Sequence, residues 1–238
     1  MLKKRDLIDA IAALPGGGTL LKEPGCVLNS GWDTVSPGEI YVLGLNPGGN
    51  PENFGSIASH IEATPGGPWS CYDESWNTLP GRHPHQLRAK KYIFTLGFDH
   101  RDVLATNAYF TTSKDARDLA LITSRMLCGS ANAFAPYWEV HKLLLSIVRP
   151  KLILCLGNSE SPNGSSFAAL RAAMGLNGAR GESQNYRNGK YFVAVAPWDR
   201  TNNVFVAGVP HPSRFAASEG LSEFLRAFGK KAGIAGAA

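Results

Sequence analysis

Four short runs of apolar residues along the chain have the pattern of central β-strands. Each run is rich in valine, isoleucine, leucine or alanine and is bounded by turn-forming residues. Runs of this kind are typical of strands that are covered on both faces of a sheet. The predicted strands are Ile40–Leu45, Val103–Thr106, Leu152–Leu156 and Val204–Ala207.

Between these runs, apolar residues recur at the three- and four-residue spacing of amphipathic helices. The N-terminal segment also fits a short amphipathic helix, which ends before Pro15. Asp6 and Asp9 interrupt its apolar residues, so this segment does not have the core of a signal peptide. The other predicted helices are Gln86–Leu96, Ser113–Leu127, Phe134–Val148, Ser165–Met174 and Ser218–Lys231.

Strands that alternate with helices predict a parallel sheet with helices on both faces. Asn188-Gly189, inside the segment Tyr186–Tyr191, is a strong signal for a two-residue hairpin, so we expect an extra edge hairpin before the last parallel strand. The fold class that follows is α/β, with three layers (α/β/α) and a central four-stranded, mainly parallel sheet plus the edge hairpin. No repeat or linker divides the chain, and we expect one domain over residues 1–238.

The segment Gly48–His85 interrupts this alternation and is dense in glycine, proline and aromatic residues. A loop of this length inside a compact domain is usually either functional or contains elements that the pattern does not reveal. Both interpretations stay open from the sequence.

Composition supports a globular protein, because 44% of the residues are hydrophobic and 18% are charged. The formal charge of +5 mildly favours a polyanionic partner. No apolar run is long enough to cross a bilayer, so we expect no membrane association and a cytoplasmic location.

The four cysteines are far apart in the sequence and form no Cys-x-x-Cys pair. Cys155 lies inside an apolar strand, the usual place for an inert buried thiol. His83-Pro84-His85 is a weak hint of metal, but no neighbouring cysteine or carboxylate completes a site. We therefore expect reduced thiols and no metal or cofactor. The cysteines are Cys26, Cys71, Cys128 and Cys155.

Polar residues follow the predicted strands at the point where each strand ends. Asn46 follows the first strand, Asn107 the second, Gly157-Asn158-Ser159 the third and His211-Pro212-Ser213 the last. Ligands of open parallel sheets bind outside the carboxyl ends of the strands, so these side chains are expected to converge at one edge. Each one alone has a simpler explanation, as a turn opener, a cap or an exposed rigid loop.

Together, these motifs resemble the uracil-DNA glycosylase superfamily. The loop after the first strand and the loop after the last are similar to its two paired motifs, and Asn107 matches the asparagine with which it reads the base. Motif order and strand spacing match over roughly Ile40 to Phe228. The first loop looks most like the mismatch-specific uracil/thymine and the single-strand-selective uracil glycosylase branches, and the last loop is more similar to the latter. The motifs are Gly44-Leu45-Asn46-Pro47-Gly48 and His211-Pro212-Ser213.

The resemblance implies a uracil-DNA glycosylase-like fold and a monofunctional DNA glycosylase of base excision repair. Such an enzyme flips a uracil, or a related deaminated or damaged base, out of DNA and hydrolyses its N-glycosidic bond. Asn46 would orient the water and His211 would donate a hydrogen bond to the base, so both are the catalytic candidates. No lysine lies in the matched motifs to form a Schiff base. The implied partner is DNA, and the protein is expected to act as a monomer without cofactor or metal.

The resemblance also assigns substrate contacts. Phe54 would stack on the base, although a place in the core explains this residue as well. Phosphate contacts fall to Ser213, Arg214 and Lys114, and a solvated charged face is the alternative for Lys114 and for Arg117. The other substrate-binding candidates are Gly44, Leu45, Pro47, Gly48, Asn107, Pro212 and Ser213.

Three departures from the superfamily affect these assignments. The classical uracil branch has an aspartate where Asn46 stands, and an amide is no general base. The iron–sulfur branches have a cysteine pattern that this chain lacks, and Arg214–Ala217 match no intercalating loop. Two other function classes stay open: a non-cleaving protein of this fold that binds nucleic acid or a nucleotide, and a nucleoside hydrolase. Abasic sites in DNA, or cleavage of free nucleosides, would discriminate these classes from a DNA glycosylase.

Overall fold

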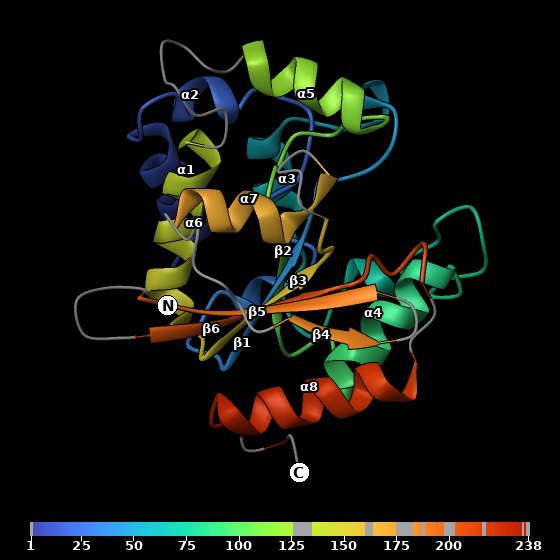
Figure 1. Cartoon of the computed structure of the whole chain (residues 1–238). Coiled ribbons are helices and arrows are strands. Elements are labelled where there is room, and N and C mark those ends of the chain that lie inside the picture. Colours follow the sequence, from blue (N-terminus) through green and yellow to red (C-terminus); the bar gives the residue numbers. More distant parts are fainter. Residues whose placement is uncertain are drawn as a thin grey trace.

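The structure is a computed structural model that describes residues 2–125, 135–159, 164–174, 183–186, 189–197, 203–215, 218–234 and 236 (Figure 1). Its strands form one sheet with the order β2-β1-β3-β6-β5-β4. The strands are β1 (Ile40–Gly44), β2 (Leu104–Asn107), β3 (Leu152–Leu156), β4 (Ser183–Tyr186), β5 (Gly189–Pro197) and β6 (Asn203–Val209).

The predicted fold class is confirmed. The pairs β1–β2, β1–β3 and β3–β6 are parallel, which makes a central four-stranded parallel sheet. β4 and β5 pair antiparallel with each other, and β5 pairs antiparallel with β6, so the expected hairpin forms the edge of the sheet. Gly189 begins β5, and Asn188, the other residue of the hairpin signal, lies outside the described residues.

The central strands are buried on both faces, and alternate residues belong to two separate cores. In β1, Tyr41 and Leu43 pack into one cluster, whereas Ile40 and Val42 pack into the other. The second cluster also holds residues of α4 (Pro84–Thr95) and α8 (Glu219–Lys231). Because successive side chains of a strand point to opposite faces, the two clusters are the two interfaces of a three-layer α/β/α fold.

The remaining helices cover the opposite face of the sheet from α4 and α8, as Figure 1 shows. Residues of each of them pack in the first cluster, with Tyr41 and Leu43. They are α1 (Lys4–Ala12), α2 (Gly17–Leu20), α3 (Ile57–Ala63), α5 (Ala116–Arg125), α6 (Ala135–Val148) and α7 (Ser166–Ala173).

The predicted strands and helices are found with small shifts of their ends. The clearest shift is at α5, which was expected to begin at Ser113 and begins at Ala116. Asp115 is the residue that caps this helix, because its Oδ1 accepts hydrogen bonds from the backbone N–H groups of Arg117 and Asp118 at 2.8 Å each. Ser113 is thereby available for the site described below. Leu127 and Phe134, predicted helix ends, lie outside the described residues.

The long segment Gly48–His85 contains secondary structure that the hydrophobic pattern did not reveal. It holds α3 and the short 3₁₀-helices η2 (Pro51–Asn53) and η3 (Cys71–Asp73); a third 3₁₀-helix, η1 (Trp32–Thr34), precedes β1. Ser56 caps α3, since its Oγ accepts a hydrogen bond from the Ser59 backbone N–H at 3.2 Å. These elements are too short to show a helical period.

Within the described ranges, no helix is long and apolar enough to cross a membrane. Cys26 and Cys155 are buried and Cys71 is half-buried, all three as free thiols; Cys128 lies outside the described residues. Burial raises the pKa of the Cys26 thiol to about 12, so it is an unreactive thiol at neutral pH.

Candidate functional site

The strand order brings the polar strand ends to one edge of the sheet. From β1 the chain passes to β2 on one side and then to β3 on the other, so the strand order reverses next to β1. Such a switch point opens a crevice at the carboxyl ends of the strands. Four polar or turn-forming residues lie in order across this edge: Asn107 at the end of β2, Asn46 after β1, Gly157 after β3 and His211 after β6. Since β3 lies between them, the ends of β1 and β6 are about 10 Å apart.

The loop after β1 is clamped by Ser113, a residue outside both predicted motifs. The Ser113 backbone N–H donates to the Pro47 carbonyl at 3.2 Å, and the Gly49 N–H donates to the Ser113 carbonyl at 3.3 Å. Ser113 is 2% exposed, so these bonds are shielded from water. The turn formers Pro47, Gly48 and Gly49 therefore lie along a fixed path at the sheet edge.

The same serine orients the Asn46 amide. Asn46 Nδ2 donates to the Pro47 carbonyl and to Ser113 Oγ, each at 2.8 Å. A carbonyl only accepts, so the nitrogen must face Pro47, and both of its hydrogens are used. Oδ1 has no hydrogen bond within the described part of the chain. Asn46 therefore presents one acceptor to a ligand or a water, instead of the donor–acceptor pair that the residue type alone allows.

Asn107 ends β2 opposite Gly44, the last residue of β1. Its side chain lies over the Gly44 Cα, because a Cβ built on Gly44 would be only 2.4 Å from Asn107 Oδ1. Asn107 is 6% exposed, yet its amide makes no hydrogen bond to any described residue. Buried amides usually have partners, so this one is available to a ligand at the strand ends.

A buried histidine holds the backbone just after Asn107. His141 Nε2 donates to the Ala108 carbonyl at 3.1 Å, and its Nδ1 accepts from the Tyr41 hydroxyl at 2.8 Å. Burial lowers the pKa of His141 to about 4, so the ring is neutral at pH 7. Ala108 N–H in turn donates to the Gly44 carbonyl at 2.8 Å, which joins the ends of β1 and β2. His141 thus holds the backbone next to Asn107 in place.

Phe54 and Leu45 have different contacts at the loop after β1. The Phe54 ring lies against Gly49, where a Cβ would be 3.1 Å from Phe54 Cε2, and Phe54 is half-buried and belongs to neither core cluster. Leu45 is half-buried and packs against the first core cluster, and its carbonyl accepts from Tyr109 N–H at 2.9 Å. A place beside the loop agrees with a stacking role for Phe54.

The loop after β6 fixes the tautomer of His211. Ser213 backbone N–H and Ser213 Oγ approach His211 Nδ1 at 3.3 Å and 2.6 Å. A backbone N–H only donates, so Nδ1 accepts and the proton of the neutral ring is on Nε2. Burial, and then the neighbouring Arg214, lowers the pKa of His211, which keeps the ring neutral at pH 7. Nε2–H makes no hydrogen bond to a described residue and is an open donor.

Helix α4 anchors the His-Pro-Ser loop. Arg88 Nη1 donates to the carbonyl of the buried Pro212 at 2.7 Å, and the His85 ring contacts the His211 ring with centroids 5.2 Å apart. Arg214 and Lys114, two of the predicted phosphate contacts, are exposed beside the loops after β6 and β1. Exposed cations at these places are suitable for a polyanion but do not require one.

Four side chains at the site were missed from the sequence: Ser113, His141, His85 and Arg88. Ser113 was predicted as the first residue of a helix, and His85 was weighed only as a metal ligand. In the described part of the chain, no three histidine, cysteine, aspartate or glutamate side chains come together as a metal site requires. The one available signal was the three-residue spacing of His85 and Arg88. It predicts that both lie on one face of a helix but not which residues that face contacts.

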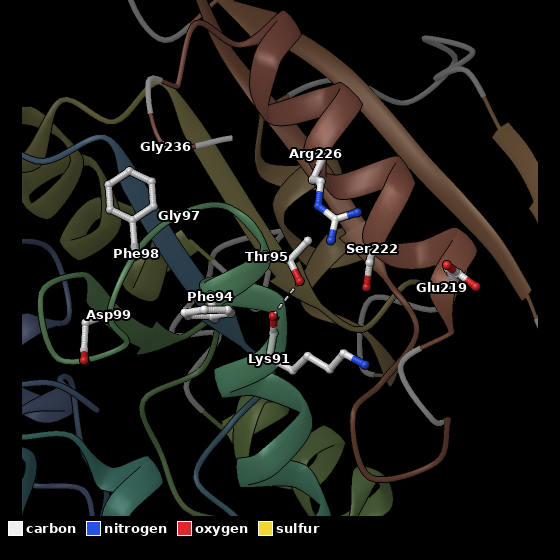
Figure 2. A pocket seen from close by; sticks show the side chains of 10 residues that line it. All are labelled: Lys91, Phe94, Thr95, Gly97, Phe98, Asp99, Glu219, Ser222, Arg226 and Gly236. Atoms are coloured by element: carbon white, nitrogen blue, oxygen red, sulfur yellow. Dashed lines mark hydrogen bonds between the residues drawn. The ribbon is translucent and has the colours of Figure 1, made fainter. Parts of the chain in front are cut away.

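A cavity of about 760 Å³ lies elsewhere, between α4 and α8 (Figure 2). Lys91 and Phe94 face Glu219 and Arg226 across it, so its charges are balanced. None of the predicted site residues lines this cavity. Its lining offers no group of unusual reactivity, so the strand ends remain the candidate site.

Comparison of the sequence with known protein families and with curated proteins finds no match. The interpretation of the site therefore rests on its own geometry, in which the Asn46 acceptor, the Asn107 amide and the His211 donor have no hydrogen-bond partner among the described residues. All three belong to loops or strand ends at one edge of one sheet. Such a set can bind a flat polar ring and orient a water beside it.

Proposed function

We propose that this protein is a monofunctional DNA glycosylase of the uracil-DNA glycosylase superfamily, hydrolysing the N-glycosidic bond of uracil or a related deaminated base. The observation that supports it is the convergence of three open hydrogen-bonding positions at the strand ends. A uracil ring offers a carbonyl and an N–H on its base-pairing edge and a second carbonyl at O2. The Asn107 amide is complementary to the first pair, and His211 Nε2–H is complementary to O2.

The reaction these groups support is dissociative. As the glycosidic bond breaks, negative charge grows on the base, and an oriented N–H donor at O2 stabilises it. His211 donates from Nε2 while remaining neutral, because Ser213 holds Nδ1 as the acceptor. Asn46 Oδ1 accepts a hydrogen bond from the attacking water and orients it, but removes no proton. We expect a slower enzyme than one with a carboxylate at this position.

DNA as the partner, action as a monomer and a cytoplasmic location are part of this proposal. The formal charge of +5 and the exposed Lys114 and Arg214 support a polyanionic ligand. Phe54, half-buried against Gly49, would stack on the flipped base, a contact worth about 1–3 kcal/mol.

The test uses oligonucleotides that carry uracil, a thymine mismatch, hypoxanthine or xanthine, followed by alkaline cleavage of abasic sites. We expect cleavage at uracil, and a loss on the order of a hundredfold in the single-turnover rate for Asn46→Ala and for His211→Ala. Both variants should bind DNA nearly as well as the wild type. Asn46→Asp should be faster on uracil, because it restores a general base.

Two results would contradict the proposal. A gel shift without abasic sites would indicate a non-cleaving binding protein, and cleavage of free nucleosides but not of DNA would indicate a nucleoside hydrolase. Wild-type cleavage by either alanine variant would remove its residue from the mechanism.

A further inference from the structure

The His211 ring lies against a cluster of aromatic and histidine rings from the segment before α4. His85, in the first turn of α4, contacts the His211 ring edge to face, with centroids 5.2 Å apart and planes at 69°. His85 also stacks on the Tyr72 ring and contacts the Trp76 ring, with centroids 6.3 Å and 5.6 Å away. His85 therefore contacts two large rings as well as the candidate catalytic histidine.

The backbone of His85 is fixed as firmly as its ring. His83 caps α4, accepting a hydrogen bond on Nδ1 from the His85 N–H at 3.3 Å, and Pro84 occupies the first helical position. Gln86, which is fully buried, accepts from the His83 N–H at 3.0 Å and donates to the carbonyls of Cys71 and Glu74. The first turn of α4 is thus joined to η3 and does not need the His-Pro-Ser loop for its own order.

Helix α4 contacts the His-Pro-Ser loop at two points on one face. His85 contacts the His211 ring, and Arg88, three residues later, donates to the Pro212 carbonyl at 2.7 Å. Residues three apart lie on the same side of a helix, so both contacts come from one rigid surface. Among the described residues the loop itself supplies Ser213, whose backbone N–H and Oγ both approach Nδ1 and leave the other atoms of the ring to be positioned by its neighbours.

We propose that His85 is a positioning residue, whose ring sets the tilt of the His211 imidazole and shields it from water. The effect of this residue on catalysis rests on the proposed function, whereas its effect on the position of the His211 ring rests on the ring contacts alone. A donor must be aimed at the place where charge develops, and an error of about 1 Å can lower a rate about a hundredfold. We assign the orientation of the His211 ring to α4, because within the described residues the loop contributes no other ring against it.

The charges around the two rings also favour a neutral His211. The titratable or charged neighbours are His83, His85 and Arg88 from α4 and its cap, Tyr72 from η3 and Arg214 from the loop. Burial, reinforced by nearby His211, lowers the pKa of His85 to about 3. His85 is therefore an uncharged ring that packs against His211. Its removal would admit water to His211 and raise the pKa of that ring toward its ordinary value.

The test combines histidine NMR with kinetics on the full chain. In protein labelled with ¹⁵N at histidine, without DNA, the pKa and tautomer of His211 are followed in the wild type, His85→Ala, His85→Gln and His85→Phe. We expect the alanine and glutamine variants to raise the pKa of His211, and the phenylalanine variant, which keeps a ring, to preserve it. On uracil oligonucleotides the first two should lose at least about tenfold in single-turnover rate, with DNA affinity within about twofold.

His60→Ala is the matched control, because His60 lies on α3, on the other face of the sheet, and its loss should change neither readout. An unchanged His211 titration in both ringless variants would overturn the proposal, and so would a phenylalanine variant as impaired as alanine. The glutamine variant keeps the test decisive if alanine does not fold. Since the titration needs no substrate, it decides the role of His85 even if the protein cleaves no DNA, which would instead contradict the proposed function.

Discussion

Gly44→Ala adds a single methyl group at the end of β1, close to Asn46 in the chain and next to the side chain of Asn107. A Cβ at Gly44 would lie 2.4 Å from Asn107 Oδ1, about 1 Å short of ordinary contact. Its next contacts, Asn107 Cγ and the Thr106 carbonyl, are at 3.5 Å and need no shift. Gly44 does not have the left-handed conformation that disfavours alanine, so the substitution acts almost entirely on the Asn107 amide.

The expected effect follows from that displacement. If Asn107 reads the base, moving its amide by about 1 Å should lower the single-turnover rate about a hundredfold, or about 2.7 kcal/mol of transition-state stabilisation. The cost in folding stability should be smaller, about 1 kcal/mol, because a side chain can turn where backbone cannot. The assay is single-turnover cleavage of a uracil oligonucleotide, with DNA affinity from fluorescence anisotropy and stability from urea denaturation.

Two comparisons make this prediction sharp. Gly18→Ala makes the same chemical change at an exposed helical position where a Cβ contacts nothing, and it should leave the rate unchanged. In an Asn107→Ala background, Gly44→Ala should cost little further activity, because the oxygen that it displaces is gone. Wild-type cleavage by Gly44→Ala would refute the base-reading role of Asn107. An equal loss of rate in both backgrounds would refute the idea that Gly44→Ala acts by displacing the Asn107 amide.

Three further predictions follow from the same geometry. A Cβ at Gly48 contacts no protein atom within 4 Å, so Gly48→Tyr should fold normally, keep some uracil activity and exclude 5-substituted bases; equal loss on both substrates would mean that the loop itself is damaged. Asn107→Ala and Asn107→Asp should both lose uracil activity, the second with a trace on cytosine oligonucleotides, since a site that hydrogen-bonds its substrate rejects a mismatched analogue by about ten-thousandfold; full uracil activity in the alanine variant would contradict the assignment. The folded-state pKa of His141 is about 4, below its ordinary value, so the unfolded chain binds the proton more tightly. The contribution of neutral His141 to the free energy of unfolding is fully present above about pH 6.5. It falls by about 3 kcal/mol as the pH drops to about 4. Urea denaturation across that range should show a shallower pH dependence for His141→Gln, and an equal slope would place the acid sensitivity elsewhere.

The strands, the main helices and the layer order could be predicted from the sequence because they follow from local patterns. An apolar run such as Leu152–Leu156 is buried wherever it lies, and its bounds were predicted to the residue. The convergence of Asn46, Asn107 and His211 at one edge was likewise expected, since parallel strands all end on the same side. Which reaction these residues perform remains a prediction.

Short elements and side-chain partners could not be predicted, since neither has a period in the sequence. Helix α3 spans only Ile57–Ala63, too few residues for its apolar spacing to stand out. Ser113 was assigned to a helix start because serine is a common cap, whereas Asp115 takes that place and releases the Ser113 hydroxyl to Asn46.

The orientation of the candidate catalytic groups was decided by tertiary structure alone. The sequence determined that a histidine follows β6, but only the contacts with Ser213 and His85 determine which nitrogen donates and how the ring tilts. Those partners are set by distance in space, and His85 lies more than a hundred residues from His211 along the chain. Local preference thus determines which elements form, while packing between distant elements determines the direction of each hydrogen bond at the site.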